Sequence, residues 1–319
     1  MTRRLRRQLA IVGALVATTL LLPGGSAGAV VGGADATGLY PYFARIIVFA
    51  GGEPHYCGGA LIDRTWVLTA AHCFQHDQPV ESTVLQLPGS DYTSHGVRIH
   101  PLYNGHVTDG HDLALVFIDP SKTVGAVQIQ VGAPADPGAY AAGTLATVMG
   151  WGFTSAGTGL SDRLMAADTV LRSDAYMDAL FNPWKHSWWP FHPGATDKWP
   201  DDLVVGAGGK RQTTCEADSG GPLVVYRNDV PIEVGVTSFG PKSCNSAAGF
   251  AELARAQLAW VASEVPSVTA RWGGCDAGFG TVGRYTVRYT QTSFAGAERD
   301  GSYYWAFGCE PLEPPTNGG

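Results

Sequence analysis

Residues 215–223 read Cys215-Glu216-Ala217-Asp218-Ser219-Gly220-Gly221-Pro222-Leu223, and no other stretch of the chain is as informative. Ser219 stands in a Gly-rich turn, where it is a candidate nucleophile. The apolar run that begins at Pro222 is typical of a β-strand. A lone Ser in such a turn is usually only a turn residue, so its role depends on whether the chain also supplies a base and a group that orients the base.

Two other segments, far from Ser219 in the sequence, offer those partners. Residues 69–73 follow an apolar run and contain His72, and residues 111–115 contain Asp112 at the head of another apolar run. A Ser hydroxyl is a weak nucleophile until a base removes its proton. An imidazole does this best when a carboxylate fixes its tautomer. The three residue types together therefore indicate acyl-transfer chemistry, although each alone also has a purely structural explanation.

From residue 30 to about residue 265, the chain resembles secreted bacterial chymotrypsin/trypsin-like (S1-type) serine proteases. The order His72, Asp112, Ser219 is that of this family and differs from the order in subtilisins and α/β-hydrolases. Four further motifs match: Val30-Val31-Gly32-Gly33, Cys57-Gly58-Gly59, Gly150-Trp151-Gly152 and Ser238-Phe239-Gly240. The resemblance implies a serine endopeptidase with two six-stranded antiparallel β-barrels and a site in the cleft between them. Ser219 would attack, His72 would carry the proton and Asp112 would orient His72.

One position departs from the family's pattern. The resemblance implies that the backbone N–H groups of Ala217 and Ser219 form the oxyanion hole, and the family usually has Gly where this chain has Ala217. A left-handed backbone costs Ala about 1 kcal/mol or more, whereas losing one oxyanion-hole donor costs roughly 3–4 kcal/mol. Because the strain is the smaller effect, we expect a working site. Ser238 and Gly240, at the specificity pocket, would pair with the substrate backbone as an added strand.

The resemblance also locates the base of the specificity pocket. In trypsins, an Asp six residues before the nucleophile binds Lys or Arg side chains, and here that position is Thr213, which does not neutralise a cation. Gly240 and Gly249 stand where the pocket walls are open. We therefore expect large apolar or aromatic residues before the cleaved bond (P1). An acidic P1 residue, attracted by Lys242, is the alternative.

The N-terminus of the mature chain is a second functional element. In this family, a freed α-amino group folds inward and pairs with the Asp before the nucleophile, and this pair orders the oxyanion hole and the pocket. The matching residues are Val30 and Asp218, although Asp218 could also be a solvated turn residue. Because signal cleavage is expected directly before Val30, we expect signal peptidase alone to yield the active form.

Residues 1–29 have the features of a cleavable signal peptide. Arg residues precede an uninterrupted apolar run at residues 9–22, and Ala27-Gly28-Ala29 supplies small residues for cleavage. The run is too short to span a membrane easily, so an uncleaved anchor is the poorer interpretation. We expect a secreted protein with no membrane association after cleavage.

The composition narrows the classes of partner. The formal net charge is −7, and the mature form is more acidic still, because residues 1–29 carry four Arg and no acidic residue. An acidic chain without clustered Lys and Arg does not suit phosphate backbones, which excludes nucleic acid. The expected partners are protein or peptide substrates. We expect no metal, no organic cofactor and a monomer.

Six Cys residues in an exported protein favour disulfides over metal ligation or free thiols. Their spacing alone does not select among the possible pairings. The family resemblance implies that Cys57 pairs with Cys73 and Cys215 with Cys244. Cys275 and Cys309 are then left for each other.

Short apolar runs separated by Gly, Pro, Asn and Asp predict an all-β protease domain over residues 30–265. The expected strands lie at residues 44–49, 59–62, 66–69, 113–118, 145–149, 222–226 and 233–237. Residues 174–180 and 253–265 predict helices, and the Trp- and Pro-rich residues 181–200 predict an irregular loop. Residues 266–319 form a short β-rich extension with a strand at 281–290, either a disulfide-pinned hairpin packed on the barrel or a binding module.

A different class of function is a non-catalytic extracellular binding protein on the protease fold, disabled at Ala217. The presence of all three of His72, Asp112 and Ser219 argues against it, because inactive relatives commonly lose the His or the Ser.

Overall fold

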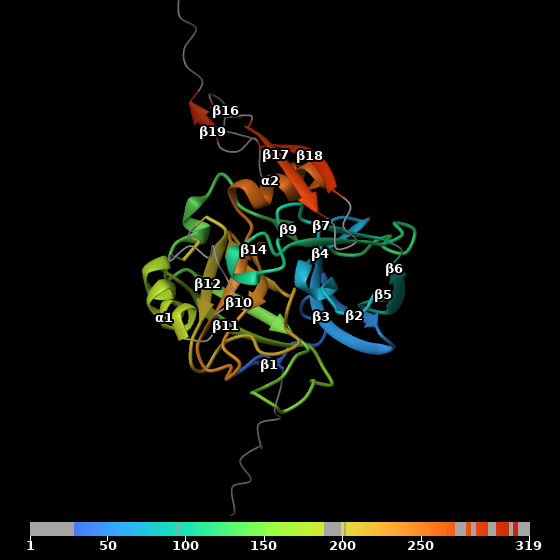
Figure 1. Ribbon diagram of the computed structural model, residues 1–319, viewed down its shortest axis with the longest axis vertical. Helices are drawn as coiled ribbons and strands as arrows, with labels where there is room; N and C mark the ends of the chain where they lie inside the picture. Colours follow the sequence, from blue (N-terminus) through green and yellow to red (C-terminus); the bar gives the residue numbers. More distant parts are fainter. Residues whose placement is uncertain are drawn as a thin grey trace, which may run out of the picture.

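The computed structural model describes residues 29–94, 96–187, 199–200, 202–271, 279–281, 285–292, 298–305 and 309–311, without side chains for 182–187 and from 270 onward. The expected signal-peptide run and Cys275 lie outside the described residues. Most strands of the described residues belong to two large, mainly antiparallel sheets that pack side by side (Figure 1).

The first sheet contains seven strands in the order β6-β5-β2-β3-β4-β8-β7. Its strands are β2 (Phe43–Ala50), β3 (Glu53–Leu61), β4 (Trp66–Thr69), β5 (Val80–Leu87), β6 (Ser90–Ser94), β7 (Val97–Ile99) and β8 (Ala114–Phe117). Burial along β2 alternates, because successive side chains of a strand point to opposite faces. The four strands expected in this half of the chain fall on β2, β3, β4 and β8.

The second sheet has eight strands and closes on itself. Six of them form a ring, β11-β10-β13-β14-β15-β12, because β12 also pairs with β11. The short strand β1 extends the edge at β11, and β9 pairs parallel with β14. The bounds are β1 (Ala34–Asp35), β9 (Gln130–Val131), β10 (Leu145–Gly150), β11 (Met165–Arg172), β12 (Val204–Gly208), β13 (Pro222–Arg227), β14 (Val230–Phe239) and β15 (Ala247–Glu252). This is a closed six-stranded barrel, and with the open first sheet it gives the expected double-barrel fold.

The largest apolar core belongs to both sheets. It contains Ile46, Leu68 and Leu115 from the first sheet and Met149 and Val236 from the second, all of them buried. Burying one such side chain stabilises a fold by about 1.5–3 kcal/mol relative to leaving it exposed. The shared core therefore fixes the two sheets relative to each other and, with them, the loops at their junction.

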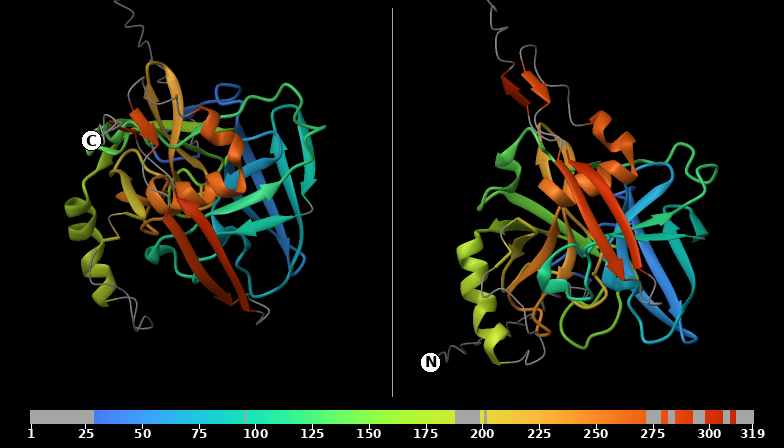
Figure 2. Two further views of the ribbon diagram at one scale, coloured as in Figure 1. Left: turned by 90° about the horizontal axis from the view of Figure 1, so that it is seen from above. Right: turned by 45° about the horizontal axis from the view of Figure 1, so that its top comes forward.

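Two α-helices lie outside the sheets: α1 (Asp174–Ser187) and α2 (Arg255–Glu264) (Figure 2). Shorter 3-10 helices are η1 (Ala71–Phe74), η2 (Val107–Asp109), η3 (Pro137–Tyr140) and η4 (Pro266–Arg271). The expected irregular loop at 181–200 is wrong in its first part, because α1 continues through residue 187. Phe181 packs against Trp199 and Phe239, and this tertiary contact holds the added helical turn on the barrel.

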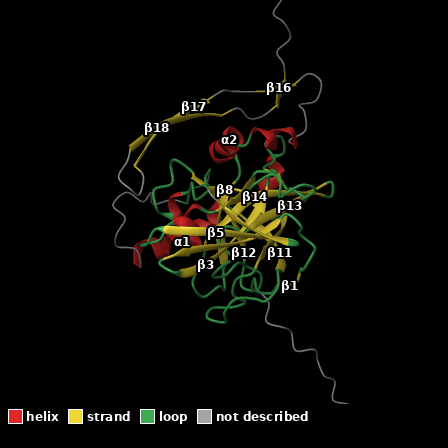
Figure 3. Cartoon of the chain, turned by 90° about the vertical axis from the view of Figure 1, so that its right-hand side faces the viewer, coloured by secondary structure: helices red, strands yellow, loops and turns green. Residues whose placement is uncertain are grey.

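The C-terminal extension contains four strands in two separate pairs. β17 (Tyr285–Thr292) pairs with β18 (Glu298–Trp305), and β16 (Phe279–Thr281) pairs with β19 (Cys309–Pro311). The expected strand at 281–290 thus lies a few residues too early. β18 contacts α2, and Figure 3 shows the hairpin and α2 at the same end of the molecule. Within the described part of the chain, no helix is both long enough and apolar enough to cross a bilayer.

Two disulfides tie loops to the sheets. Cys57 on β3 bonds to Cys73 in η1, with the Cα atoms 6.4 Å apart. Cys215 bonds to Cys244 with a Cα separation of 5.2 Å and joins the turn before Ser219 to the loop after β14. These are the two pairings implied by the family resemblance. The third expected pairing, Cys275 with Cys309, involves residues whose side chains the structure does not describe.

Glu233 on β14 is a fully buried carboxyl group, with 0% of its surface exposed. Neither of its carboxyl oxygens has a hydrogen-bond partner among the described residues. Burial raises the pKa of Glu233 well above its ordinary value of 4.5. The folded protein therefore keeps this group neutral at a pH at which the unfolded chain ionises it.

We predict that this mismatch destabilises the protein as the pH rises. Stability is unaffected below the unfolded pKa and falls by up to about 1.4 kcal/mol per pH unit between the unfolded and the raised folded pKa. Glu233→Gln should therefore increase the free energy of unfolding at pH 8 and have much less effect at pH 4, as measured by urea unfolding. Glu53→Gln, at an exposed position, is the matched control. A Glu233→Gln effect that is the same at both pH values would contradict this explanation.

Candidate active site

A cleft of about 530 Å³ opens where the first sheet meets the loops of the second. His72 lines it from the first barrel and Ser219 from the second. The remaining lining residues come from the start of β3, the residues around η1, the 153–160 loop and the turn before Ser219: Pro54, His55, Tyr56, Cys57, Cys73, His76, Phe153, Gly159, Leu160, Glu216 and Ala217. The cleft thus brings together two of the three residues expected to carry the chemistry.

The third, Asp112, lies behind His72 and is completely buried. Its Oδ2 accepts a hydrogen bond from His72 Nδ1 at 2.7 Å, and its Oδ1 accepts one from the His72 backbone N–H at 2.9 Å. The Ser238 hydroxyl donates to the same Oδ2 at 2.5 Å. Because a carboxylate only accepts, the proton of neutral His72 sits on Nδ1, and Nε2 keeps its lone pair.

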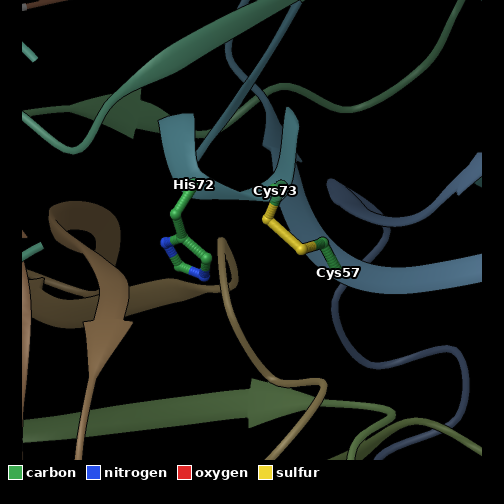
Figure 4. A group of neighbouring side chains, drawn as sticks. All are labelled: Cys57, His72 and Cys73. Carbon is green, nitrogen blue, oxygen red and sulfur yellow. A yellow bond between two sulfur atoms is a disulfide. The ribbon is translucent and has the colours of Figure 1, made fainter. Parts of the chain in front are cut away.

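His72 is a base of suitable strength in this setting. Burial lowers the pKa of His72, but the charge of Asp112 and its hydrogen bond raise it, and the net shift is upward from 6.5. The imidazole remains 23% exposed to solvent and faces the cleft. Figure 4 shows the ring of His72 beside the Cys57–Cys73 disulfide, whose bonded sulfurs lack the thiolate that metal ligation requires.

The turn that carries Ser219 is held between the two sheets by backbone hydrogen bonds. Gly58 N–H of β3 donates to the Ser219 carbonyl at 2.7 Å, and Gly220 N–H donates to the Thr237 carbonyl of β14 at 2.7 Å. Gly220 has a φ of +79°, and a Cβ there would lie 2.2 Å from Thr69 Oγ1. Only Gly fits at this position. Because Gly220 has no side chain, the turn can lie directly against Thr69 of the first sheet while it is bonded to β14 of the second.

Ala217 adopts the left-handed conformation, with a φ of +68°. The peptide before it is held by the Glu216 carbonyl, which accepts the Phe153 N–H at 2.8 Å. No cis peptide occurs in the described chain, so the Ala217 N–H points away from that carbonyl. A Cβ on Gly152 would lie 2.2 Å from the Glu216 oxygen. The Gly152-Phe153 turn therefore fixes the orientation of the Ala217 N–H.

Asp218 is buried with 0% exposure and is surrounded by backbone donors. Gly152 N–H donates to Oδ1 at 2.8 Å and Cys215 N–H to Oδ2 at 2.9 Å, and the Val30 N–H is a third donor. With no positive charge beside it, burial raises the pKa of Asp218 to about 7. Val30 has a φ of +61°, which is unfavourable for a β-branched residue while its peptide bond to Ala29 is intact.

The expected specificity residues differ in burial and surroundings. Thr213 is 1% exposed, and its hydroxyl has no hydrogen-bond partner within the described structure. Gly240 is exposed. Gly249 pairs with Phe239 across β14 and β15, and the Phe239 ring lies 2.5 Å from where a Gly249 Cβ would be. Gly249 therefore makes room for the Phe239 ring, and its place in a pocket wall stays a prediction.

Two features of the site do not follow from the sequence motifs. Ser238 was expected only to pair with substrate, yet its hydroxyl also donates to Asp112. The Gly150-Trp151-Gly152 motif had no assigned role, yet Gly152 and Phe153 bind Asp218 and Glu216. Gly152 was the only residue in the sequence that could have indicated this role, because Gly often stands where another part of the backbone comes close.

Comparison with known proteins agrees with this geometry. The family model described as Trypsin matches residues 30–261. A brachyurin from Leptuca pugilator is 31% identical over 225 residues, which are 66% of this chain and 86% of the brachyurin. A trypsin from Saccharopolyspora erythraea is 30% identical over 218 residues, 66% of this chain and 86% of its own. Granzyme M from Homo sapiens is 32% identical over 200 residues, 60% of this chain and 71% of its own.

A solved structure titled HL collagenase shares the fold, with a TM-score of 0.58 at 22% identity, over 74% of this chain and 99% of that one. The relatives include eukaryotic proteins and a bacterial trypsin, so they show the family and not the expected bacterial source. A family match over most of the chain, together with relatives named trypsin and granzyme, decides the class. The chain belongs to the trypsin family and is a serine endopeptidase.

Proposed function

We propose that the protein is a secreted endopeptidase in which Ser219, His72 and Asp112 act as the catalytic triad. The observation that carries the proposal is the hydrogen bond between His72 Nδ1 and buried Asp112, with Ser219 lining the same cleft as His72. His72 Nε2 takes the Ser219 proton as the hydroxyl attacks the peptide carbonyl, and the imidazolium then protonates the leaving amine. Water repeats the sequence on the acyl-enzyme, while Asp112 stabilises the imidazolium.

The backbone N–H groups of Ala217 and Ser219 form the oxyanion hole in this proposal. The bond from Phe153 N–H to the Glu216 carbonyl supports it, because that bond directs the Ala217 N–H to the other side of the peptide. The left-handed strain at Ala217 costs about 1–2 kcal/mol. A productive donor contributes roughly 3–4 kcal/mol of transition-state stabilisation, so Ala217 does not disable the site.

Ser238 and Gly240 pair with the substrate backbone, and Thr213 forms the neutral base of the P1 pocket. A buried hydroxyl offers no charge to a Lys or Arg side chain, which supports preference for large apolar or aromatic P1 residues.

Cleavage before Val30 completes the active form. Its new α-ammonium group would pair with Asp218, which already accepts the Val30 N–H in the uncut chain. The ammonium group would place a positive charge beside the Asp218 carboxylate and so lower the pKa of Asp218 from about 7. Cleavage would also remove the φ restriction at Val30, since φ requires a preceding carbonyl. Signal peptidase alone performs this step in our proposal.

The secreted chain should cleave a diverse peptide library after large apolar or aromatic residues and react with a Ser-directed phosphonate. Ser219→Ala should abolish the labelling and lower kcat by at least about 10³-fold, because the nucleophile is lost. Ser121→Ala, at an exposed position, is the matched control and should retain both. A wild-type chain that neither cleaves nor labels would instead support a non-catalytic binding protein.

We predict that Gly152→Ala selectively impairs the oxyanion hole. The added Cβ would collide with the Glu216 carbonyl at 2.2 Å and with Asp218 Oδ1 at 2.6 Å, turning the Ala217 N–H away. We expect kcat to fall about 10²–10³-fold with little change in KM. Gly96→Ala is the control, since its Cβ would meet Phe117 only at 3.8 Å. Circular dichroism should confirm that both variants are folded, and an unchanged kcat in Gly152→Ala would refute the assignment.

The mature N-terminus should be Val30 with a free α-amino group. N-terminal sequencing of the active secreted enzyme measures this directly. Asp218→Asn, which removes the partner charge, should lower kcat/KM without changing the N-terminal sequence. Active enzyme that begins at Ala29 or earlier would rule out activation by signal peptidase alone.

A further inference from the structure

Two further histidines lie on the wall of the cleft beside His72. The rings of His55 and His76 lie against each other in a tilted arrangement, with centroids 4.0 Å apart and an interplanar angle of 30°. Both line the same cleft as His72. The proposed catalytic mechanism requires neither of them, so the cleft is lined by two imidazoles beyond that of His72.

The Cys57–Cys73 disulfide brings the two histidines together. His55 lies two residues before Cys57 on β3, and alternate residues of a strand share a face. His76 lies three residues after Cys73, just beyond η1. Because the disulfide joins the two segments, the histidines are held beside each other even though His55 itself is exposed.

The hydrogen bonds of two of these imidazoles suit them to bind a metal ion. His76 Nε2 lies 2.9 Å from the Cys73 carbonyl oxygen, which only accepts, so Nε2 carries the proton and Nδ1 keeps its lone pair. His72 donates from Nδ1 to Asp112 and keeps its lone pair on Nε2. Metal-binding histidines usually donate their second ring N–H to a carbonyl or carboxylate in this way.

We propose that His55 and His76 form a binding site for a transition-metal ion of the Zn²⁺ class, and that the bound ion inhibits the enzyme reversibly. Two imidazole nitrogens at about 2.0–2.1 Å from a tetrahedral Zn²⁺ lie roughly 3.3 Å apart. The centroids of the two rings lie 4.0 Å apart, so rotation of the exposed His55 ring can turn its lone pair toward an ion beside His76. Imidazole pairs select Zn²⁺, Cu²⁺ or Ni²⁺ over Mg²⁺ or Ca²⁺, which prefer oxygen ligands.

The inhibition follows from the position of the ion, and it rests on the proposed role of His72. A divalent charge in the cleft disfavours the imidazolium form that His72 must adopt during turnover. The ion also occupies space in the cleft that Ser219 and Ala217 line. Metal binding itself does not depend on that role, so the two can be tested separately.

The test measures Zn²⁺ binding and inhibition with the mature full-length chain. Isothermal titration of ZnCl₂ into the Ser219→Ala protein at pH 7.5 should show one ion per chain, with binding at least tenfold weaker in His55→Asn and in His76→Asn. His106→Asn, which changes a histidine outside the cleft lining, is the matched control. In the active enzyme, Zn²⁺ should inhibit and EDTA should restore activity, while MgCl₂ should have no effect.

Each outcome has a distinct meaning. Inhibition that needs tenfold more Zn²⁺ in His55→Asn and His76→Asn, relative to each variant's own activity in EDTA, supports the site. Equal inhibition of all variants means that Zn²⁺ acts at His72 alone and overturns the proposal. Absence of Zn²⁺ binding to the Ser219→Ala protein also overturns it. An inactive wild-type chain that still binds Zn²⁺ through His55 and His76 would refute the triad and leave the metal site intact.

Discussion

The buried carboxyl group of Asp218 accepts backbone N–H groups from three segments that lie far apart in the sequence. One donor belongs to Val30, one to the Gly152 turn and one to Cys215, in the stretch that carries Ser219, the proposed nucleophile. A buried carboxyl group without such partners is destabilising by several kcal/mol. The need to satisfy this one group therefore holds the N-terminus, the 150 loop and the Ser219 turn in a single arrangement.

Glu233 shows what the same chemistry does without partners. Both carboxyl groups are completely buried, but only Asp218 accepts hydrogen bonds within the described structure. Burial raises the pKa of Asp218 to about 7, whereas that of Glu233 lies well above its ordinary value. Asp218 is therefore ready to ionise when a positive charge arrives, and Glu233 remains neutral. The contrast fits the activation that we propose at Asp218 and the loss of stability that we predict at Glu233.

Close backbone approach is the second constraint on the site. Gly220 lets the nucleophile turn contact Thr69, and Gly152 lets the 150 loop reach the Glu216 carbonyl. Ala217, by contrast, tolerates its left-handed conformation because the neighbouring peptide is already held by Phe153 N–H. The free-energy cost of this strain is smaller than that of losing the oxyanion-hole donor that we propose Ala217 supplies. The same disulfide that secures η1 also brings His55 to His76, so catalytic and proposed metal-binding features share one scaffold.

The sequence by itself determined the features that depend only on residues near each other along the chain, such as the positions of strands. Strand β4 was expected at its observed residues, because an apolar run between turn residues is a local signal. His72, Asp112 and Ser219 stood out by residue type and order. The tertiary structure alone decided that β11 pairs with β12, that α1 extends to residue 187 and that Phe239 fills the space beside Gly249. It also decided that Ser238 reaches Asp112, 126 residues away in sequence. Such contacts depend on how distant segments pack, and that packing leaves no periodic or turn signal in the residues themselves.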